Sequence, residues 1–179
     1  MSIELNAEQV TLWVHTRKEG VLSRMGHDLR LRAERLSLRY APETGRLELT
    51  VPADALRVEG ALQGERLEPG ALSASDRAEI ERNVRERVLE SRRHPTIRFE
   101  GTVGGSSDAA ERPVEGTLAL HGAERPLRAT ARLEGGTWQA RVRLDQRDFG
   151  IRPFKAPLGV LKVQPHVDVL VQVPAEALS

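Results

Sequence analysis

The chain has 179 residues, of which 39% are hydrophobic and 30% charged, so it is predicted to fold as a single domain, residues 1–179, around one core. Its 27 basic and 26 acidic residues are interspersed and only 3% of the residues are aromatic, which argues against the basic tracts and stacking rings of nucleic-acid binders. The absence of cysteine excludes disulfides, thiolate metal sites and cysteine nucleophiles.

No segment of the sequence has the features of a membrane anchor. Residues 1–14 lack a basic region followed by an apolar run, and no stretch approaches the ~18 to 20 apolar residues of a membrane span. We therefore expect a cytoplasmic protein without stable membrane insertion.

The first part of the chain alternates apolar and polar residues, which is typical of antiparallel strands with one buried face. A first strand is predicted around residues 10–14 and a second over residues 27–40. In this second strand the apolar residues change from odd to even positions near Glu34. We interpret this shift of parity as a bulge in one long strand. A hairpin partner is predicted at residues 47–51.

The middle of the chain changes period. Residues 53–75 contain repeated glycine and proline and are expected to be irregular. Apolar residues then recur every four positions from Ile80 to Val88, which predicts a helix over about residues 76–91 with Asp76 as its N-cap. Pro95 should end the helix, because the residue before a proline is pushed toward extended geometry.

The last part of the chain returns to alternation with a period of two. After the helix, strands are predicted at residues 96–103, 114–121, 126–133, 137–144 and 167–173, with a polar loop at 104–112. Eight strands that do not alternate with helices exclude a doubly wound parallel sheet. The sequence therefore predicts an all-β fold with one short helix between the early and late strands, either a closed antiparallel barrel or a sandwich.

The candidate chemical groups do not form a catalytic or metal-binding motif. The five histidines are scattered, with no pair at the spacing of a zinc site; they are His15, His27, His94, His121 and His166. His27 and Asp28 are adjacent, but neighbouring residues on a strand point to opposite faces. The Gly-x-Ser-x-Gly elbow of serine hydrolases is missing as well. We therefore predict no catalytic residue, no metal ligand and no cofactor.

The inward positions of the late strands mix small residues with large ones. Leu118 and Leu120 are followed by Ala129 and Ala131 on the next strand. An eight-stranded barrel is at the width where the interior is either just filled or holds one ligand, and few aromatics make complete filling harder. A well-filled core remains the alternative. If a cavity exists, its apolar lining favours a hydrocarbon ligand.

Four segments together resemble the YceI family of lipid-binding barrels. They are Gly26-His27-Asp28-Leu29, Arg92 to Phe99, Val114 to Gly122 and, above all, Gln146-Arg147-Asp148-Phe149-Gly150-Ile151. The resemblance implies a lipocalin-like antiparallel eight-stranded barrel that holds an isoprenoid or another long apolar chain, and it implies that homodimers occur. Many family members carry a secretion signal, which we do not find here, so their location is not transferred.

We interpret the chain as a non-enzymatic carrier or sequestering protein for an apolar small molecule. By parity, the predicted wall of the binding site is Leu12, Val14, Leu29, Leu31, Phe99, Leu118, Leu120, Ala129, Ala131, Trp138 and Val142. Phe149 and Phe154 flank a Gly/Pro-rich loop and could shape the mouth of the binding site, although Phe149 could equally be a plug that fixes the loop. Arg152 or His27 could meet a polar head group.

Two other functions stay open at this stage. One is a hydrolase or isomerase that acts on a lipid-like substrate through His27 and Asp28. The other is a closed-core interaction protein whose function lies on its surface.

Overall fold

Twelve strands form one antiparallel sheet in the structure, a computed structural model that describes residues 1–19, 26–156, 158 and 161–179. In chain order the strands are β1 (Ile3–Asn6), β2 (Thr11–Glu19), β3 (Asp28–Ala33), β4 (Ser37–Ala41), β5 (Arg46–Pro52), β6 (Leu56–Gln63), β7 (Arg66–Glu68), β8 (Thr96–Val103), β9 (Glu111–Leu120), β10 (Ala123–Glu134), β11 (Thr137–Asp145) and β12 (Lys162–Pro174). Their spatial order is β1-β4-β5-β8-β9-β10-β11-β12-β2-β3-β6-β7.

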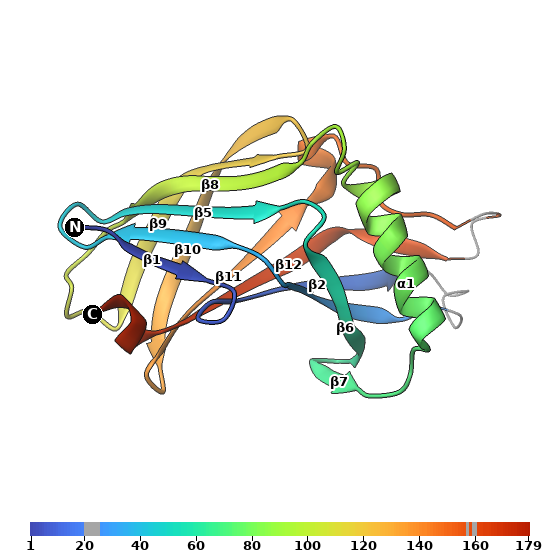
Figure 1. Ribbon diagram of the computed structural model, residues 1–179, viewed down its shortest axis with the longest axis horizontal. Coiled ribbons are helices and arrows are strands. Elements are labelled where there is room, and N and C mark those ends of the chain that lie inside the picture. Colours follow the sequence, from blue (N-terminus) through green and yellow to red (C-terminus); the bar gives the residue numbers. More distant parts are fainter. Residues whose placement is uncertain (20–25, 157, 159–160) are drawn as a thin grey trace.

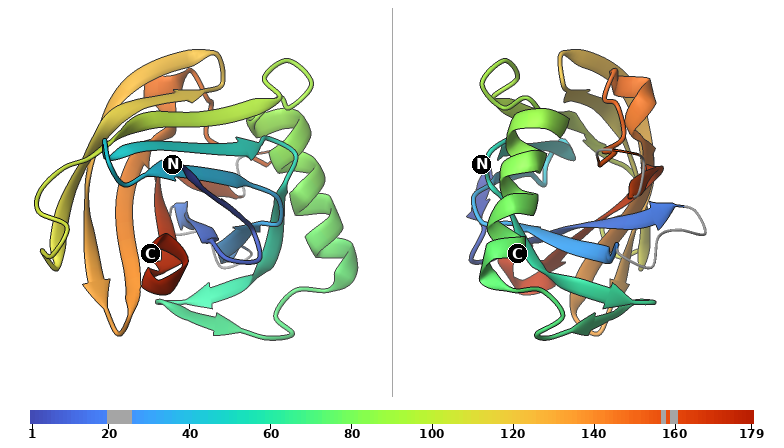
Figure 2. Two further views of the ribbon diagram at one scale, coloured as in Figure 1. Left: turned by 60° about the vertical axis from the view of Figure 1, so that its left-hand side comes forward. Right: turned by 90° about the vertical axis from the view of Figure 1, so that its right-hand side faces the viewer.

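The sheet curls into a half-barrel, with helix α1 (Ala74–Asn83) beside β6 and both chain ends toward the opposite end of the molecule (Figure 1). The all-β antiparallel fold with one inserted helix is confirmed, but the predicted closed barrel of eight strands is wrong. The hydrogen-bonded order ends at β1 and β7, so the sheet has a seam. The connections from β3 to β4 and from β5 to β6 both cross this seam, and the amide of Glu34 donates to the carbonyl of Ala55 between these two connections. Figure 2 shows the curled sheet from two further sides.

The single long strand predicted over residues 27–40 is two strands. β3 pairs with β2 and β6, whereas β4 pairs with β1 and β5 at the other side of the seam. The parity shift near Glu34 therefore marks a corner and not a bulge. A corner and a bulge both reset which face later side chains occupy, so the sequence pattern alone does not separate them.

Residues 53–75 contain two strands that the sequence analysis missed. β6 pairs with β3, and their register shifts between Arg30, which faces Gly60, and Leu31, which faces Val58. Glu59 is thus an extra residue that breaks the alternation of β6. β7 and β1 are too short to show a periodic pattern.

The helix begins and ends earlier than predicted. Ser73 is its N-cap, and its hydroxyl accepts from the amide of Asp76 while the Asp76 carboxylate accepts from the amide of Ser73. Asp76 is therefore the third residue of a capping box and not the cap itself. A π-helical segment, η2 (Val84–Val88), continues α1, and Glu90 then leaves helical geometry with φ of 46°. The helical segment stops well before Pro95.

Several late strands are longer than predicted, and β12 begins five residues early, at Lys162. β9 begins at Glu111, inside the expected polar loop, and β10 begins at Ala123, directly after a tight turn. After β11 the chain forms the short 3-10 helix η3 (Gln146–Phe149), and another, η5 (Ala175–Leu178), follows β12. The early start of β9 places an arginine on the inner face of the sheet, as described below.

Candidate ligand-binding cavity

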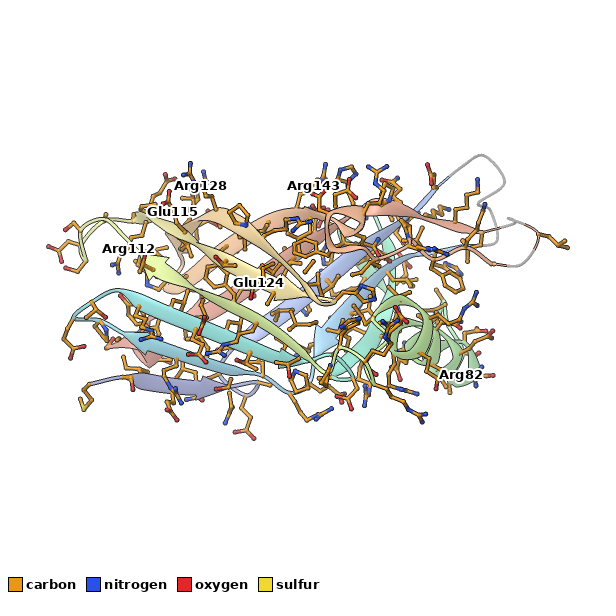
Figure 3. The ribbon with its side chains drawn as sticks, turned by 90° about the horizontal axis from the view of Figure 1, so that it is seen from above. Arg82, Arg112, Glu115, Glu124, Arg128 and Arg143 are labelled. Atoms are coloured by element: carbon orange, nitrogen blue, oxygen red, sulfur yellow. The ribbon has the colours of Figure 1, made fainter. Side chains whose placement is uncertain are left out.

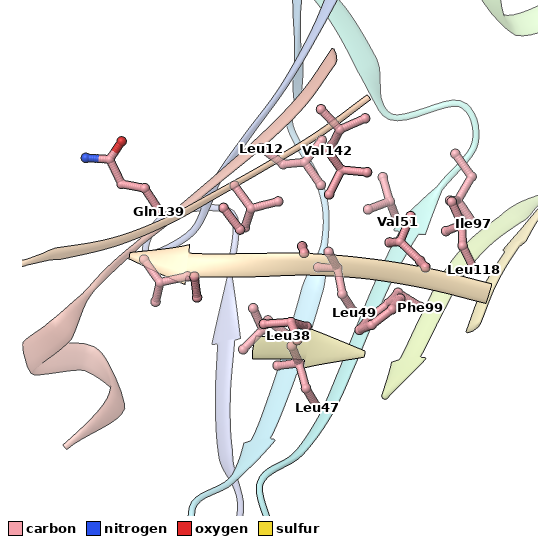
Figure 4. A pocket seen from close by; sticks show the side chains of 18 of the residues that line it. Leu12, Leu38, Leu47, Leu49, Val51, Ile97, Phe99, Leu118, Gln139 and Val142 are labelled. Atoms are coloured by element: carbon pink, nitrogen blue, oxygen red, sulfur yellow. The ribbon is translucent and has the colours of Figure 1, made fainter. Parts of the chain in front are cut away.

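The concave face of the sheet encloses a cavity of about 600 Å³. Its wall is built from alternate residues of the curled strands, closed at one end by Val84 and Val88 of η2 and by Leu89. The apolar side chains drawn in Figure 4 converge on the hollow, whereas Gln139 points away from them. This volume lies in the usual range for small-molecule pockets, about 300–1,000 Å³.

The cavity exists because the inner face is packed at its ends and sparse between them. Leu5, Val10 and Leu38 belong to a buried cluster near the first strands, while Leu89 and Phe99 belong to another near the helical segment. Between these clusters β10 and β11 present alanines, and side chains such as Val142 are only partly buried although they face inward. The described residues therefore do not form the filled core that was the alternative prediction. The hypothesis of an interaction protein with a closed core required such a filled interior and is disfavoured.

A pair of glycines lets β8 and β9 approach each other beneath the ring of Phe99. Gly101 and Gly116 are directly opposite in register. A Cβ on Gly116 would lie 2.6 Å from the Cα of Gly101 and 2.7 Å from Cζ of Phe99. Glycine is required at this position because real Cβ atoms do not approach so closely. The tip of the Phe99 ring therefore occupies the space that side chains at Gly101 and Gly116 would fill.

One end of the cavity carries a positive charge. Arg112 has the same parity on β9 as Val114 and therefore faces inward, opposite Ala131 of β10. Its guanidinium donates to the carbonyl of Gly104 at 3.0 Å and to the hydroxyl of Tyr40 at 3.2 Å. Figure 3 places Arg112 toward the end of the molecule opposite α1. Arg112 was not predicted as a site residue, because a charged side chain next to a Gly/Ser-rich segment favours a loop.

Most of the predicted wall residues line the cavity. They are Leu12, Val14, Leu31, Phe99, Leu118, Leu120, Ala129, Ala131, Trp138 and Val142. Many apolar residues of the wall come from strands whose role in the site was not predicted, including Leu38, Leu47, Leu49, Val51, Val169, Val171 and Val173. Their alternation was visible in the sequence, and parity alone would have identified them.

Three predicted residues lie outside the cavity wall. Leu29 has the parity of Leu31, but it packs with Leu72 and Ile80 in a cluster beneath the helix. Phe149 is 4% exposed and lies in the cluster with Leu89, so its side chain holds η3 in place. The centre of the Phe154 ring lies 5.0 Å from the guanidinium carbon of Arg87, outside the cavity wall. For Phe149 the structure favours the plug that was the alternative at the sequence level.

His27 and Asp28 do not form a joint site. His27 is exposed, whereas the carboxylate of Asp28 accepts from the amide of Lys18 at 2.8 Å and from the guanidinium of Arg17 at 3.4 Å. Both residues lie outside the cavity wall. Arg152 is also exposed and outside it. A hydrolase or isomerase that uses His27 and Asp28 on a ligand in the cavity is therefore disfavoured.

The outer face of the strands that form the wall carries a network that we call the outer charged cluster. Its members come from β2, β3, β11, β12 and the β6–β7 turn, and they are His15, Arg17, Arg30, Glu65, Arg141, Arg143 and Asp168. Asp168 is only 5% exposed and accepts from Arg143 at 2.9 Å and from Arg141 at 3.0 Å. These arginines hold the pKa of the Asp168 carboxyl below its ordinary value.

His15 is the most buried polar residue of this cluster, with 1% of its surface exposed. Its Nε2 accepts from Nε of Arg30 at 3.1 Å, which places the ring proton on Nδ1, and Nδ1 lies 3.5 Å from the carboxylate of Glu65. Burial, and then the positive charge of Arg30, lower the pKa of His15. The imidazole is therefore held in its neutral form.

Comparison with known protein families gives a match over nearly the whole chain. A family model described as the YceI-like domain matches residues 7–175. The chain belongs to the YceI-like domain family. The resemblance that the four sequence segments suggested is thereby confirmed. A comparison with curated proteins finds no sequence match.

Several solved structures share the fold at low sequence identity. The protein BcnA of Burkholderia cenocepacia is 10% identical, with a TM-score of 0.63 over 93% of this chain and 96% of that chain. A polyisoprenoid-binding domain from Saccharophagus degradans, implicated in plant cell wall breakdown, is 12% identical, with a TM-score of 0.60 over 97% and 98%. The YceI protein of Campylobacter jejuni has a TM-score of 0.51 at 12% identity over 69% and 71%.

Among the residues that the structure describes, no helix is both long enough and apolar enough to cross a membrane.

Proposed function

We propose that this YceI-like protein binds a long apolar chain, an isoprenoid or another lipid, in its cavity and transports or sequesters it without chemical change. The observation that carries the proposal is the cavity of about 600 Å³ with an almost wholly apolar wall. The similarity in fold to a polyisoprenoid-binding domain supports the same ligand class. A cytoplasmic location, a homodimeric state and a single-domain organisation are parts of this proposal.

The energetics favour a ligand of two or more isoprene units. Burial of apolar surface contributes roughly 0.8 kcal/mol for each CH₂, so one isoprene unit contributes on the order of 3 to 4 kcal/mol. Association costs an estimated 4 to 15 kcal/mol in lost freedom. A single unit would therefore not be held, whereas a chain that fills the hollow would.

The first experiment asks whether the purified full chain carries a ligand. Native mass spectrometry followed by lipid extraction should show a co-purified prenyl or acyl chain in the folded protein. Empty protein that also fails to bind the neutral fluorescent probe phenylnaphthylamine would contradict the proposal.

A substitution in the wall locates the binding site. We expect Ala131→Trp to fill part of the cavity and weaken phenylnaphthylamine binding by about fivefold or more, since the lost contact area is worth about 1 kcal/mol. The matched control is Ala119→Trp, because Ala119 is on the outer face of β9 opposite Glu124. Equal binding by wild type and a folded Ala131→Trp variant would argue against a ligand at this part of the wall.

A further inference from the structure

Two loops bring a glutamate and two histidines together at the end of the cavity next to the helical segment. Glu90 follows the segment, His94 precedes β8, and His121 begins the turn between β9 and β10. One ligand atom from each of the three lies within 4.8 Å of the others. The histidines are far apart in sequence, so their spacing gave no sign of this cluster.

The local backbone is shaped to present these three side chains. Glu90 and His121 have φ of 46° and 53°, a left-handed conformation that residues other than glycine rarely adopt. The carbonyl of Glu90 accepts from the amides of Arg93 and His94, which folds the loop back on itself. A Cβ on Gly122 would lie 2.9 Å from Cε1 of His94, so glycine there allows the imidazole to lie against the turn.

The hydrogen bonds of His121 leave one of its nitrogens directed at a carboxylate. Nδ1 lies 3.2 Å from the carbonyl oxygen of Phe149, which can only accept, so Nδ1 carries a proton. Nε2 lies 2.8 Å from Oε2 of Glu90. Two lone pairs at that distance repel each other, so a positive charge must lie between them, either a proton or a metal ion.

His94 adds a further nitrogen that a proton-bridged pair does not need. Its ring centroid is 4.4 Å from that of His121. Two imidazoles and a carboxylate are the protein ligands of many zinc sites with an open fourth position, and a histidine ligand commonly donates its other N–H to a backbone carbonyl, as His121 does to Phe149. Zinc bonds of about 2.0 to 2.2 Å place ligand atoms about 3.4 Å apart, so side-chain shifts of about 1 Å would close the site.

We propose that Glu90, His94 and His121 bind Zn²⁺, with the fourth position open to solvent. The residues that precede Glu90 and His121, namely Leu89 and Leu120, line the cavity. The metal therefore links the helical segment to the β9–β10 turn and stabilises the adjacent part of the cavity wall. This inference rests on the geometry of the two loops and does not depend on which ligand the cavity takes.

Zinc titration of the tag-free full chain tests the proposal. After chelator treatment and removal of the chelator, we expect one Zn²⁺ per chain by calorimetry at pH 7.5 and a rise in melting temperature with added Zn²⁺. His94→Ala should weaken zinc binding by more than about tenfold, and it leaves the contact between Glu90 and His121 in place. His166→Ala is the control, since His166 lies on β12 beside Asp145.

The proposal would be overturned by the absence of saturable zinc binding below millimolar concentration, or by equal zinc affinity in wild type and His94→Ala. Either result would mean that a proton bridges Glu90 and His121. His121→Gln provides a second variant: if it folds, it should weaken zinc binding as His94→Ala does, and unchanged affinity would likewise reject the site.

Discussion

The two faces of β2, β11 and β12 differ in how tightly their side chains are held. Asp168 and Val169 are neighbours on β12, yet Asp168 on the outer face is 5% exposed and bound by two arginines, whereas Val169 on the inner face borders the cavity and is only partly buried. In most sheets the apolar face is the better buried one. We expect the outer charged cluster to stabilise the pairing of these strands, which would leave the inner face free to contact a ligand.

Among the substitutions that test the difference between the two faces, Asp168→Ala should have the largest effect. Removal of a buried carboxylate that accepts three hydrogen bonds from Arg141 and Arg143 should lower the free energy of unfolding by about 2 to 3 kcal/mol. Binding of phenylnaphthylamine by the folded protein should stay within about twofold. Urea denaturation measures the first quantity and fluorescence titration the second. Asp108→Ala, in the exposed β8–β9 loop, is the control.

A loss of stability no greater than that of Asp108→Ala would show that the outer charged cluster does not hold the strands. A large loss of probe binding in the folded Asp168→Ala variant would show that the two faces are not independent.

A smaller effect is expected at the charged end of the inner face. Arg112→Met should weaken binding of the anionic probe anilinonaphthalene sulfonate by about three- to tenfold, since a charge-assisted hydrogen bond to the sulfonate is lost. Phenylnaphthylamine lacks the sulfonate, so its affinity should change by less than about twofold. Arg128→Met is the matched control, because Arg128 projects from the outside of the sheet beside Glu115 (Figure 3). Equal weakening of both probes would mean that Arg112 acts only through packing.

The smallest effect is a change in how stability depends on pH. The pKa of His15 is lowered in the folded protein, so below about pH 6.5 the unfolded chain binds a proton that the folded chain does not. The contribution of His15 to the free energy of unfolding is therefore fully present above that pH and is lost as the pH falls. Unfolding in urea between pH 8 and pH 5 should show a shallower decline for His15→Asn than for wild type, with exposed His166→Asn as the control. Equal slopes would show that Arg30, Glu65 and the other charges around His15 compensate for its burial.

The sequence predicted the fold class where alternation was long and unbroken. The strands β8 to β12 were all found because each carries several inward apolar residues with constant parity. The misses occurred where one residue interrupts the pattern, such as Glu59 at the bulge of β6, or where the strand is as short as β1. A corner near Glu34 and a bulge produce the same parity shift, so the closure of the sheet could not be predicted.

The candidate site was predictable along each strand but not across strands. Parity correctly directed Leu12, Leu118 and Val142 inward. Leu29 has the correct parity too, but it packs under the helix. Whether an inward residue borders the cavity or packs under the helix depends on its position along the strand relative to the neighbouring strands. This relative position is set by the register between strands, and the pattern of a single sequence does not contain that register.

The pairing of β2 with β12 also determines when the cavity can form. Leu12 faces Val171 in this pair, so the sheet joins residues from near the two ends of the chain. Folds dominated by such distant contacts fold slowly, in milliseconds to seconds, because the loop-closure entropy is lost before the contacts form. During synthesis on the ribosome, β2 has to wait until β12 has emerged. Until then the apolar side chains of the future wall are exposed to water, which makes the incomplete chain prone to aggregation.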